Sequence, residues 1–299
     1  MAASRVVIVR ADDPPRRPQD IDPQTIGRMF DLGMRLLTGR SSAADAVRAV
    51  FSPSDRVGIK INAIAAPELA TGPAVSFPFA RLLSGAGIPS RNIIVWDRTN
   101  RELTDAGYKL NIEPGSVQVY GTDTAGAGYA GEPTQHRGIA SLFSSVMTDR
   151  LTASVSLAIL KDHGMAGVTA GMKNYFGAIH NPNKYHDDHC DPYVAELSDS
   201  PPIKSRHRLT ILDALLVQYH RGPSYNPRWA EPSGVLVFSL DPVAADAVGW
   251  RMIERLRARK GLPSLEEDGR PPLYIATAER LGLGRAGETD IRVIEETVR

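Results

Sequence analysis

The chain alternates short apolar runs with amphipathic segments, which is typical of a sheet whose strands are joined by helices. Apolar runs that predict strands cover residues 5–10, 56–62, 93–97, 155–160, 209–216, 235–240 and 291–296. Apolar residues at helical spacing predict helices over 24–37, 41–51, 242–260 and 274–282. Alternation of the two favours a parallel sheet. We therefore predict an α/β fold with a mostly parallel sheet flanked by helices.

Several predicted strands end in residues that are typical of binding sites. Lys60 and Asn62 end the second strand, Asp97 ends the third, and Lys161 and His163 end the fourth. Ligands of open α/β sheets bind beyond the carboxyl ends of the strands, so these residues are expected to converge there. The residues predicted to bind substrate at this edge are Lys60, Asn62, Asn174, Asp213, Asp241 and Asp246.

Residues 160–191 concentrate the candidate chemistry. They contain Lys161, Lys173, four histidines, and Cys190, the single cysteine of the chain. Lysines can hold an anion and a histidine can move a proton. We predict His163, Lys161 and Lys173 as catalytic residues. The alternative is a polar surface loop, but Lys161 and His163 follow a buried run and alternate with Asp162, which places them on one face of the strand.

Two of the aspartates have a structural alternative. Asp241 precedes Pro242 and could cap the helix that begins there. Asp246 lies in the first turns of that helix, where the helix dipole contributes only about 0.3–1 kcal/mol, too little to offset deep burial. We therefore expect Asp246 to have a hydrogen-bond or cationic partner, and a site lysine is one candidate.

The four histidines of this stretch could instead hold a metal. His163, His180, His186 and His189 are the predicted ligands, and the last two are spaced to share one helix face. Zinc, iron or nickel sites take such ligands, often with a carboxylate. The alternative is a loop in which Asp188 or Asp191 caps a helix. One cysteine excludes an iron–sulfur cluster held by this chain alone.

The composition of the chain gives no support for binding to nucleic acid or for a membrane span. The 299 residues include 35 Lys+Arg and 34 Asp+Glu, so there is no basic surplus for nucleic acid. No apolar run reaches the roughly 18 residues of a membrane span. Residues 5–10 are too short for a signal sequence, which predicts a cytoplasmic protein, or an exported one if a leader has been removed. We expect a small anionic ligand, with residues 1–54 and 55–299 packed as one compact unit.

The assembled motifs resemble a bacterial family called domain of unknown function 362. They are Lys60-x-Asn62, Leu160-Lys161-x-His163, Met172-Lys173-Asn174-x-Phe176-Gly177, Leu212-Asp213-Ala214 and Ser239-x-Asp241-Pro242-Val243-Ala244-x-Asp246. The resemblance covers roughly residues 55–295 and implies an α/β protein of poorly assigned activity. Many relatives carry a twin-arginine leader and some carry ferredoxin-like cysteine clusters, both of which this chain lacks. A looser likeness, at the level of the fold, is to nickel-dependent lactate racemases.

Three functions remain open from the sequence. The first is an enzyme for a small carboxylate-like anion, an isomerase, a lyase or a metal-dependent oxidoreductase, with lysines that bind the anion and His163 as the acid or base. The second is a redox metalloprotein that uses the histidines of residues 163–191. The third is a non-catalytic protein that binds an anionic ligand.

Overall fold

A computed structural model describes residues 3–14 and 20–298. Its strands are β1 (Ser4–Ala11), β2 (Val57–Lys60), β3 (Ile93–Asp97), β4 (Gln118–Gly121), β5 (Thr134–His136), β6 (Ile139–Ser141), β7 (Ala153–His163), β8 (Gly167–Thr169), β9 (His207–Gln218), β10 (Ala230–Ser239) and β11 (Ile291–Val298). Its helices are α1 (Pro23–Thr38), α2 (Ala43–Arg48), α3 (Pro73–Gly85), α4 (Asn100–Asp105), α5 (Tyr193–Asp199), α6 (Pro201–Lys204), α7 (Pro242–Arg259) and α8 (Leu273–Arg280). None of the described helices is long and apolar enough to span a bilayer.

One large sheet organises the described residues. Eight of its strands follow the order β11-β1-β10-β9-β7-β2-β3-β4, and β8 pairs with the end of β7. β9, β7, β2, β3 and β4 run parallel, and β1 runs parallel to β11. β10 is antiparallel to both of its neighbours. The predicted α/β fold with a mostly parallel sheet is therefore confirmed.

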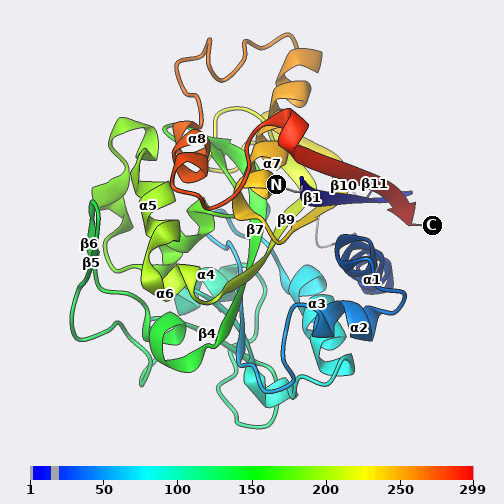
Figure 1. The fold of residues 1–299 in the computed structure, drawn as a ribbon, viewed down its shortest axis with the longest axis vertical. Helices are drawn as coiled ribbons and strands as arrows, with labels where there is room; N and C mark the ends of the chain where they lie inside the picture. The colour runs from blue at the N-terminus through cyan, green and yellow to red at the C-terminus, as the bar shows by residue number, and fades with distance from the viewer. Residues whose placement is uncertain (1–2, 15–19, 299) are drawn as a thin grey trace.

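Helices cover both faces of the sheet (Figure 1). α1 and α3 bury one face together with the apolar side chains of β1, β2 and β9, such as Val7, Ile59 and Ile211. α5, α7 and α8 pack on the other face. β1, from the N-terminal segment, lies between β10 and β11, so that segment shares the sheet of residues 55–299.

Local sequence explains where helices α1 and α7 begin. Asp22 accepts hydrogen bonds from the backbone N–H groups of Gln24 and Thr25, and Pro23 starts α1. Asp241 does the same for Val243 and Ala244 at the start of α7. Each carboxylate satisfies N–H groups that have no partner within the helix. The capping alternative for Asp241 is thus confirmed.

Two parts of the chain differ from the prediction. Residues 98–150 have little pattern apart from the apolar run over 116–121, where β4 forms as a strand; they also form α4, the β5–β6 hairpin and a π-helical turn, η3 (Val146–Arg150). The prediction that His186 and His189 share a helix face is wrong. His189 has a φ of 59° in the short segment η6 (Asp188–Cys190), so the backbone turns left-handed there and no continuous helix joins the two.

Candidate functional site

A cavity of about 510 Å³ lies at the carboxyl ends of β2, β3 and β7. Lys60 pairs in register with Ser156, and β7 continues past that level to His163. Seven predicted site residues line this cavity: Lys60, Asn62, Lys161, His163, Lys173, Asn174 and His186. The expected convergence of the two lysine-bearing strand ends at one edge is present.

Lys60 forms a closed ion pair rather than a free cation. Its Nζ donates to Asp97 Oδ1 at 2.6 Å, to the Ile61 carbonyl at 2.7 Å and to Asn174 Oδ1 at 3.2 Å. An ammonium group has three donors, and all three are used. A Cβ on Gly177 would lie 2.8 Å from Lys60 Nζ, so only glycine lets the backbone cover this ion pair.

Lys161, unlike Lys60, forms no ion pair among the described residues. Its side chain is fully buried, and its Nζ has no hydrogen-bond partner among the described residues. Burial is the main cause that lowers the pKa of Lys161 to about 7; the Asp97 charge acts against the shift and Lys173 adds to it. A buried amine without a partner is costly when charged, so Lys161 exchanges its proton near neutral pH.

Lys173 carries a charge that neighbouring groups do not neutralise. Its Nζ lies 3.2 Å from His186 Nε2, 3.6 Å from Cys190 Sγ and 3.9 Å from the centre of the Phe176 ring. His186 Nδ1 donates to the Pro182 carbonyl, so Nε2 is the acceptor for Lys173. Burial lowers the pKa of Lys173 to about 8, and Cys190 opposes that shift.

His163 is a neutral hydrogen-bond donor in this arrangement. Its Nδ1 accepts from the backbone N–H groups of Met165 at 3.2 Å and Ala166 at 3.1 Å, which leaves the ring proton on Nε2. Burial, with Lys173 and His186 as further causes, lowers the pKa of His163 to about 2. The unliganded site therefore contains an imidazole rather than an imidazolium at neutral pH.

We expect His163 to remain neutral from about pH 5 to pH 8, because a pKa far below the usual value keeps the charged form unpopulated. Two-bond ¹H–¹⁵N correlation spectra should show the Nε2–H tautomer throughout this range. A His163→Gln variant assigns the signal. Titration of that signal near the ordinary pKa of about 6.5 would contradict this description of the site.

Asp246 holds the backbone that carries Lys173 and Asn174. Its Oδ1 accepts from Gly171 N–H at 2.7 Å, and its Oδ2 accepts from Met172 N–H at 3.1 Å and from the Tyr274 hydroxyl at 3.2 Å. Burial raises the pKa of Asp246 to about 7. The expected hydrogen-bond partners exist, but they are backbone groups and a tyrosine, not a site lysine. Asp246 therefore does not line the cavity but fixes the backbone that carries Lys173 and Asn174.

Asp162, which was not predicted, anchors the other side of β7. It is fully buried, and its Oδ1 pairs with Arg270 at 2.9 Å and lies 3.7 Å from the buried Arg257. Its Oδ2 accepts from Gly222 N–H at 2.7 Å, next to Pro223 in the cavity wall. The sequence contains one signal for it. A carboxylate that alternates with two site residues in a buried strand must face the opposite side and needs a cation there.

The family model described as Domain of unknown function (DUF362) matches residues 57–251, which is more than half of the chain. The chain belongs to the DUF362 family. The matched range contains Lys60, Lys161, Lys173 and Asp246, whereas Arg270 and Tyr274, which support the site, lie beyond it.

One solved structure that is similar to this DUF362 protein is a crystal structure of a protein from Thermotoga maritima. The two chains are 10% identical with a TM-score of 0.44, and the match covers 82% of this chain and 60% of that chain. No curated protein matches the sequence.

Several predicted residues of this DUF362 protein lie outside the cavity. Asp213 is buried in β9, its Oδ2 meets no donor among the described residues, and burial raises its pKa to about 6. Asp241 caps α7. It follows the carboxyl end of β10, which runs antiparallel to β9 and therefore ends at the edge of the sheet opposite the carboxyl ends of β7 and β9. His180 is exposed and packs against the Tyr129 ring, and His189 Nδ1 faces the Met165 carbonyl.

The four histidines are not gathered into a metal site. No group of three or more His, Cys, Asp or Glu residues is arranged around a common point in the described part of the chain. His163 and His186 stack at 5.8 Å, but Nδ1 of the first accepts backbone N–H groups and Nε2 of the second faces Lys173. The donor set does not fit a metal. The transition metal stays a prediction, which elemental analysis of the purified protein tests.

Proposed function

We propose that this DUF362 protein is an enzyme that acts on a small organic anion, with a carboxylate-like group, bound in the cavity at the carboxyl ends of β2, β3 and β7. The observation that carries the proposal is the buried Lys161 amine, which lines the cavity and has no partner among the described residues. A buried cation requires a counter-charge, and a ligand can supply one.

The charges around the cavity favour an anion. Both carboxylates in its wall are already paired, Asp97 with Lys60 at 2.6 Å and Glu102 with Arg98 at 3.6 Å. Lys161 and Lys173 face no carboxylate in a described ion pair. Below about pH 7, a bound carboxylate would therefore meet two cationic groups that are not already paired with another carboxylate.

The apolar part of the wall fits a carbon skeleton. Phe176, Pro182 and Pro223 line the cavity, and Ile64 and Met165, at 61% and 47% exposed, lie at its border with solvent. A cavity of about 510 Å³ has the size of a small-molecule site. A ligand with a short carbon chain and one or two carboxylates suits both the charges and the surface.

We assign proton transfer to Lys161, with Lys173 as the cation that holds the ligand. A group whose pKa lies near the working pH is the most effective acid or base, and the pKa of Lys161 is about 7. His163, with its pKa of about 2, acts instead as a neutral donor through Nε2. If the neutral Lys161 amine removes a proton from the carbon next to the carboxylate, Lys161 becomes cationic and lies beside the negative charge that forms on the ligand. Such chemistry is typical of isomerases and lyases.

A panel of short carboxylates tests the function. Acetate, pyruvate, lactate and malonate are added to the protein, binding is followed by the rise in melting temperature, and turnover is followed by ¹H NMR in D₂O. We expect at least one member to stabilise the protein and to exchange or lose a carbon-bound proton, with kcat/KM rising as the pH passes about 7. The exposed Lys109→Met variant serves as a control and should behave as the wild type.

Two outcomes would exclude this function. Stabilisation without turnover of any member would identify a non-catalytic binding protein for organic anions. No stabilisation at any pH between about 6 and 9 would mean that Lys161 and Lys173 do not form an anion site, because both pKa values lie within that range.

A further inference from the structure

We propose a second ligand site, for a phosphorylated small molecule, at the opposite edge of the sheet. A cavity of about 490 Å³ opens at the amino ends of β2, β3 and β4. Arg56 precedes β2, Arg91 and Asn92 precede β3, and Gln118 begins β4. We call this cavity the arginine cleft, after Arg56, Arg91 and Arg150. It shares no lining residue with the cavity at the carboxyl ends of β2, β3 and β7.

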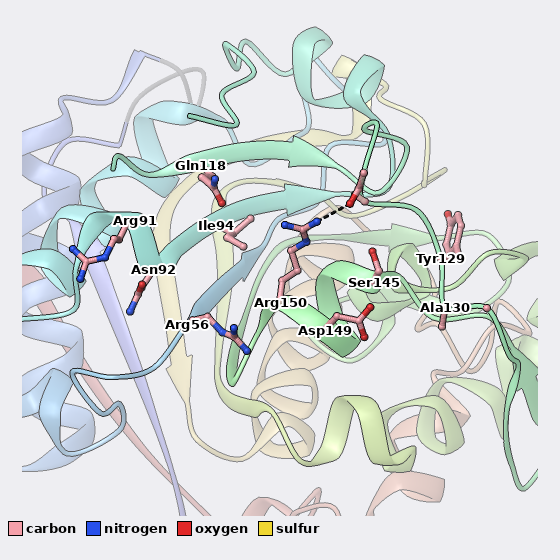
Figure 2. A pocket seen from close by; sticks show the side chains of 13 residues that line it. Arg56, Arg91, Asn92, Ile94, Gln118, Tyr129, Ala130, Ser145, Asp149 and Arg150 are labelled. Atoms are coloured by element: carbon pink, nitrogen blue, oxygen red, sulfur yellow. Dashed lines mark hydrogen bonds between the residues drawn. The ribbon is translucent and has the colours of Figure 1, made fainter. Parts of the chain in front are cut away.

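The arginine cleft carries an excess of positive charge. Figure 2 shows the three arginines and Gln118 arranged around Ile94, with Ser145 and Tyr129 farther along the wall, beyond Arg150. None of the three forms a described ion pair; Arg150 donates only to the Gly126 carbonyl, at 2.6 Å. The one carboxylate in the wall is Asp149, whose charge also acts on Arg206. Three arginines and one carboxylate thus line the cleft.

The glycine-rich loop of residues 126–131 forms another wall. Its sequence does not have the spacing of a phosphate-binding loop, but the structure places Gly126, Ala127, Tyr129, Ala130 and Gly131 at the cleft. A Cβ on Gly126 or Gly131 would meet no atom within 4 Å, so the backbone there borders open space. The backbone N–H groups of Gly126 and Gly131 donate to no other described residue. A ligand can therefore approach the main chain directly.

An independent observation points into the same cleft. Ser145 lines the cavity and is 8% exposed, yet its Oγ has no hydrogen-bond partner among the described residues. Buried hydroxyl groups are normally satisfied, so a buried hydroxyl without a partner next to a cavity marks a position for a ligand oxygen. The amides of Asn92 and Gln118 add further polar contacts, since both line the cleft.

The chemistry of these groups selects a phosphate over a carboxylate. Guanidinium groups bind phosphate through two parallel N–H donors, and a phosphate offers enough oxygens for more than one arginine. Free backbone N–H groups and a hydroxyl are typical of the remaining contacts to phosphate. Ile94 and Tyr129 offer apolar surface for an organic group. The concave shape and the net charge of +1 favour a small molecule over a nucleic acid.

Calorimetric titration of the full-length protein tests the arginine cleft. Pyrophosphate and ADP are titrated at low ionic strength in a buffer free of phosphate and sulfate. We expect both to bind one to one, ADP at least as tightly as pyrophosphate. Arg56→Gln and Arg91→Gln should each weaken binding roughly tenfold to a hundredfold, because each removes charged hydrogen bonds. Both side chains are exposed, so the unliganded melting temperature should not change.

The control is Lys161→Met, which should bind both probes as the wild type does. Equal binding by wild type and both arginine variants, or loss of binding in Lys161→Met alone, would place the anion elsewhere and overturn the proposal. Binding of pyrophosphate but not of ADP would overturn the assignment to an organic phosphate. Tighter binding of a single-stranded oligonucleotide than of ADP at the same salt concentration would overturn the assignment to a small molecule.

Discussion

Lys161→Met is expected to abolish turnover and to weaken carboxylate binding at pH 6 by roughly tenfold to a hundredfold, the range for loss of a charged hydrogen bond. The deficit should shrink toward pH 9, because the pKa of Lys161 is about 7 and the wild-type amine is then neutral. Methionine fills most of the space of the lysine stem, so the fully buried position stays packed. Binding is measured by calorimetry at both pH values.

The same variant should gain stability when no ligand is present. The pKa of Lys161 falls from 10.5 to about 7 on folding, so the unfolded chain binds more protons between these values. The contribution of Lys161 to the free energy of unfolding should therefore rise from about pH 7 toward pH 10.5 and be flat below pH 7. Lys161→Met removes this dependence, and its advantage of a few kcal/mol should be largest at or below neutral pH.

Lys109→Met, which removes an exposed lysine, is the matched control and should leave both binding and pH dependence unchanged. If Lys161→Met instead lowers the free energy of unfolding at pH 7 while each folded molecule binds carboxylate as before, Lys161 is a structural residue. The proposed site would then be wrong.

Asp162→Ala is expected to cost about 3–5 kcal/mol of unfolding free energy, since it leaves Arg257 and Arg270 without the buried one of the two carboxylates that they share. Arg257 has 0% of its side chain exposed and Arg270 has 16%. The substitution also removes the acceptor of Gly222 N–H, so Pro223 should shift in the cavity wall. Urea unfolding gives the free energy, and the carboxylate affinity should fall with it.

Glu231→Ala provides the comparison for Asp162→Ala. Glu231 pairs with Arg259 at 3.1 Å and with Lys260 at 2.7 Å, but at the surface, where ion pairs contribute about 0–1 kcal/mol. The two variants thus separate a buried network from an exposed one. A loss below about 1 kcal/mol in Asp162→Ala would mean that Asp268, which contacts both arginines, is sufficient to hold them.

The local pattern of this sequence determined several strands and helices and the edge of the sheet at which the two lysines lie. Asp22 and Pro23 define the start of α1 because capping and the fixed φ of proline act within three residues. Lys60 and Lys161 end apolar runs in parallel strands, and parallel strands end at the same edge of a sheet. Alternation in β7 placed Lys161 and His163 in the cavity wall and turned Asp162 away.

Only the tertiary structure decided what each charge does. Lys60 and Lys161 look alike in sequence, yet Lys60 meets Asp97, 37 residues away, and Lys161 meets no partner among the described residues. Asp246 contacts Gly171 across 75 residues, and Asp162 contacts Arg270 across 108. The lowered pKa of Lys161 and that of His163 follow from burial, which depends on the packing of the whole chain. The arginine cleft likewise joins residues that precede three separate strands. Periodicity and capping act over a few residues, whereas ion pairing and desolvation depend on distances that only the packed chain sets.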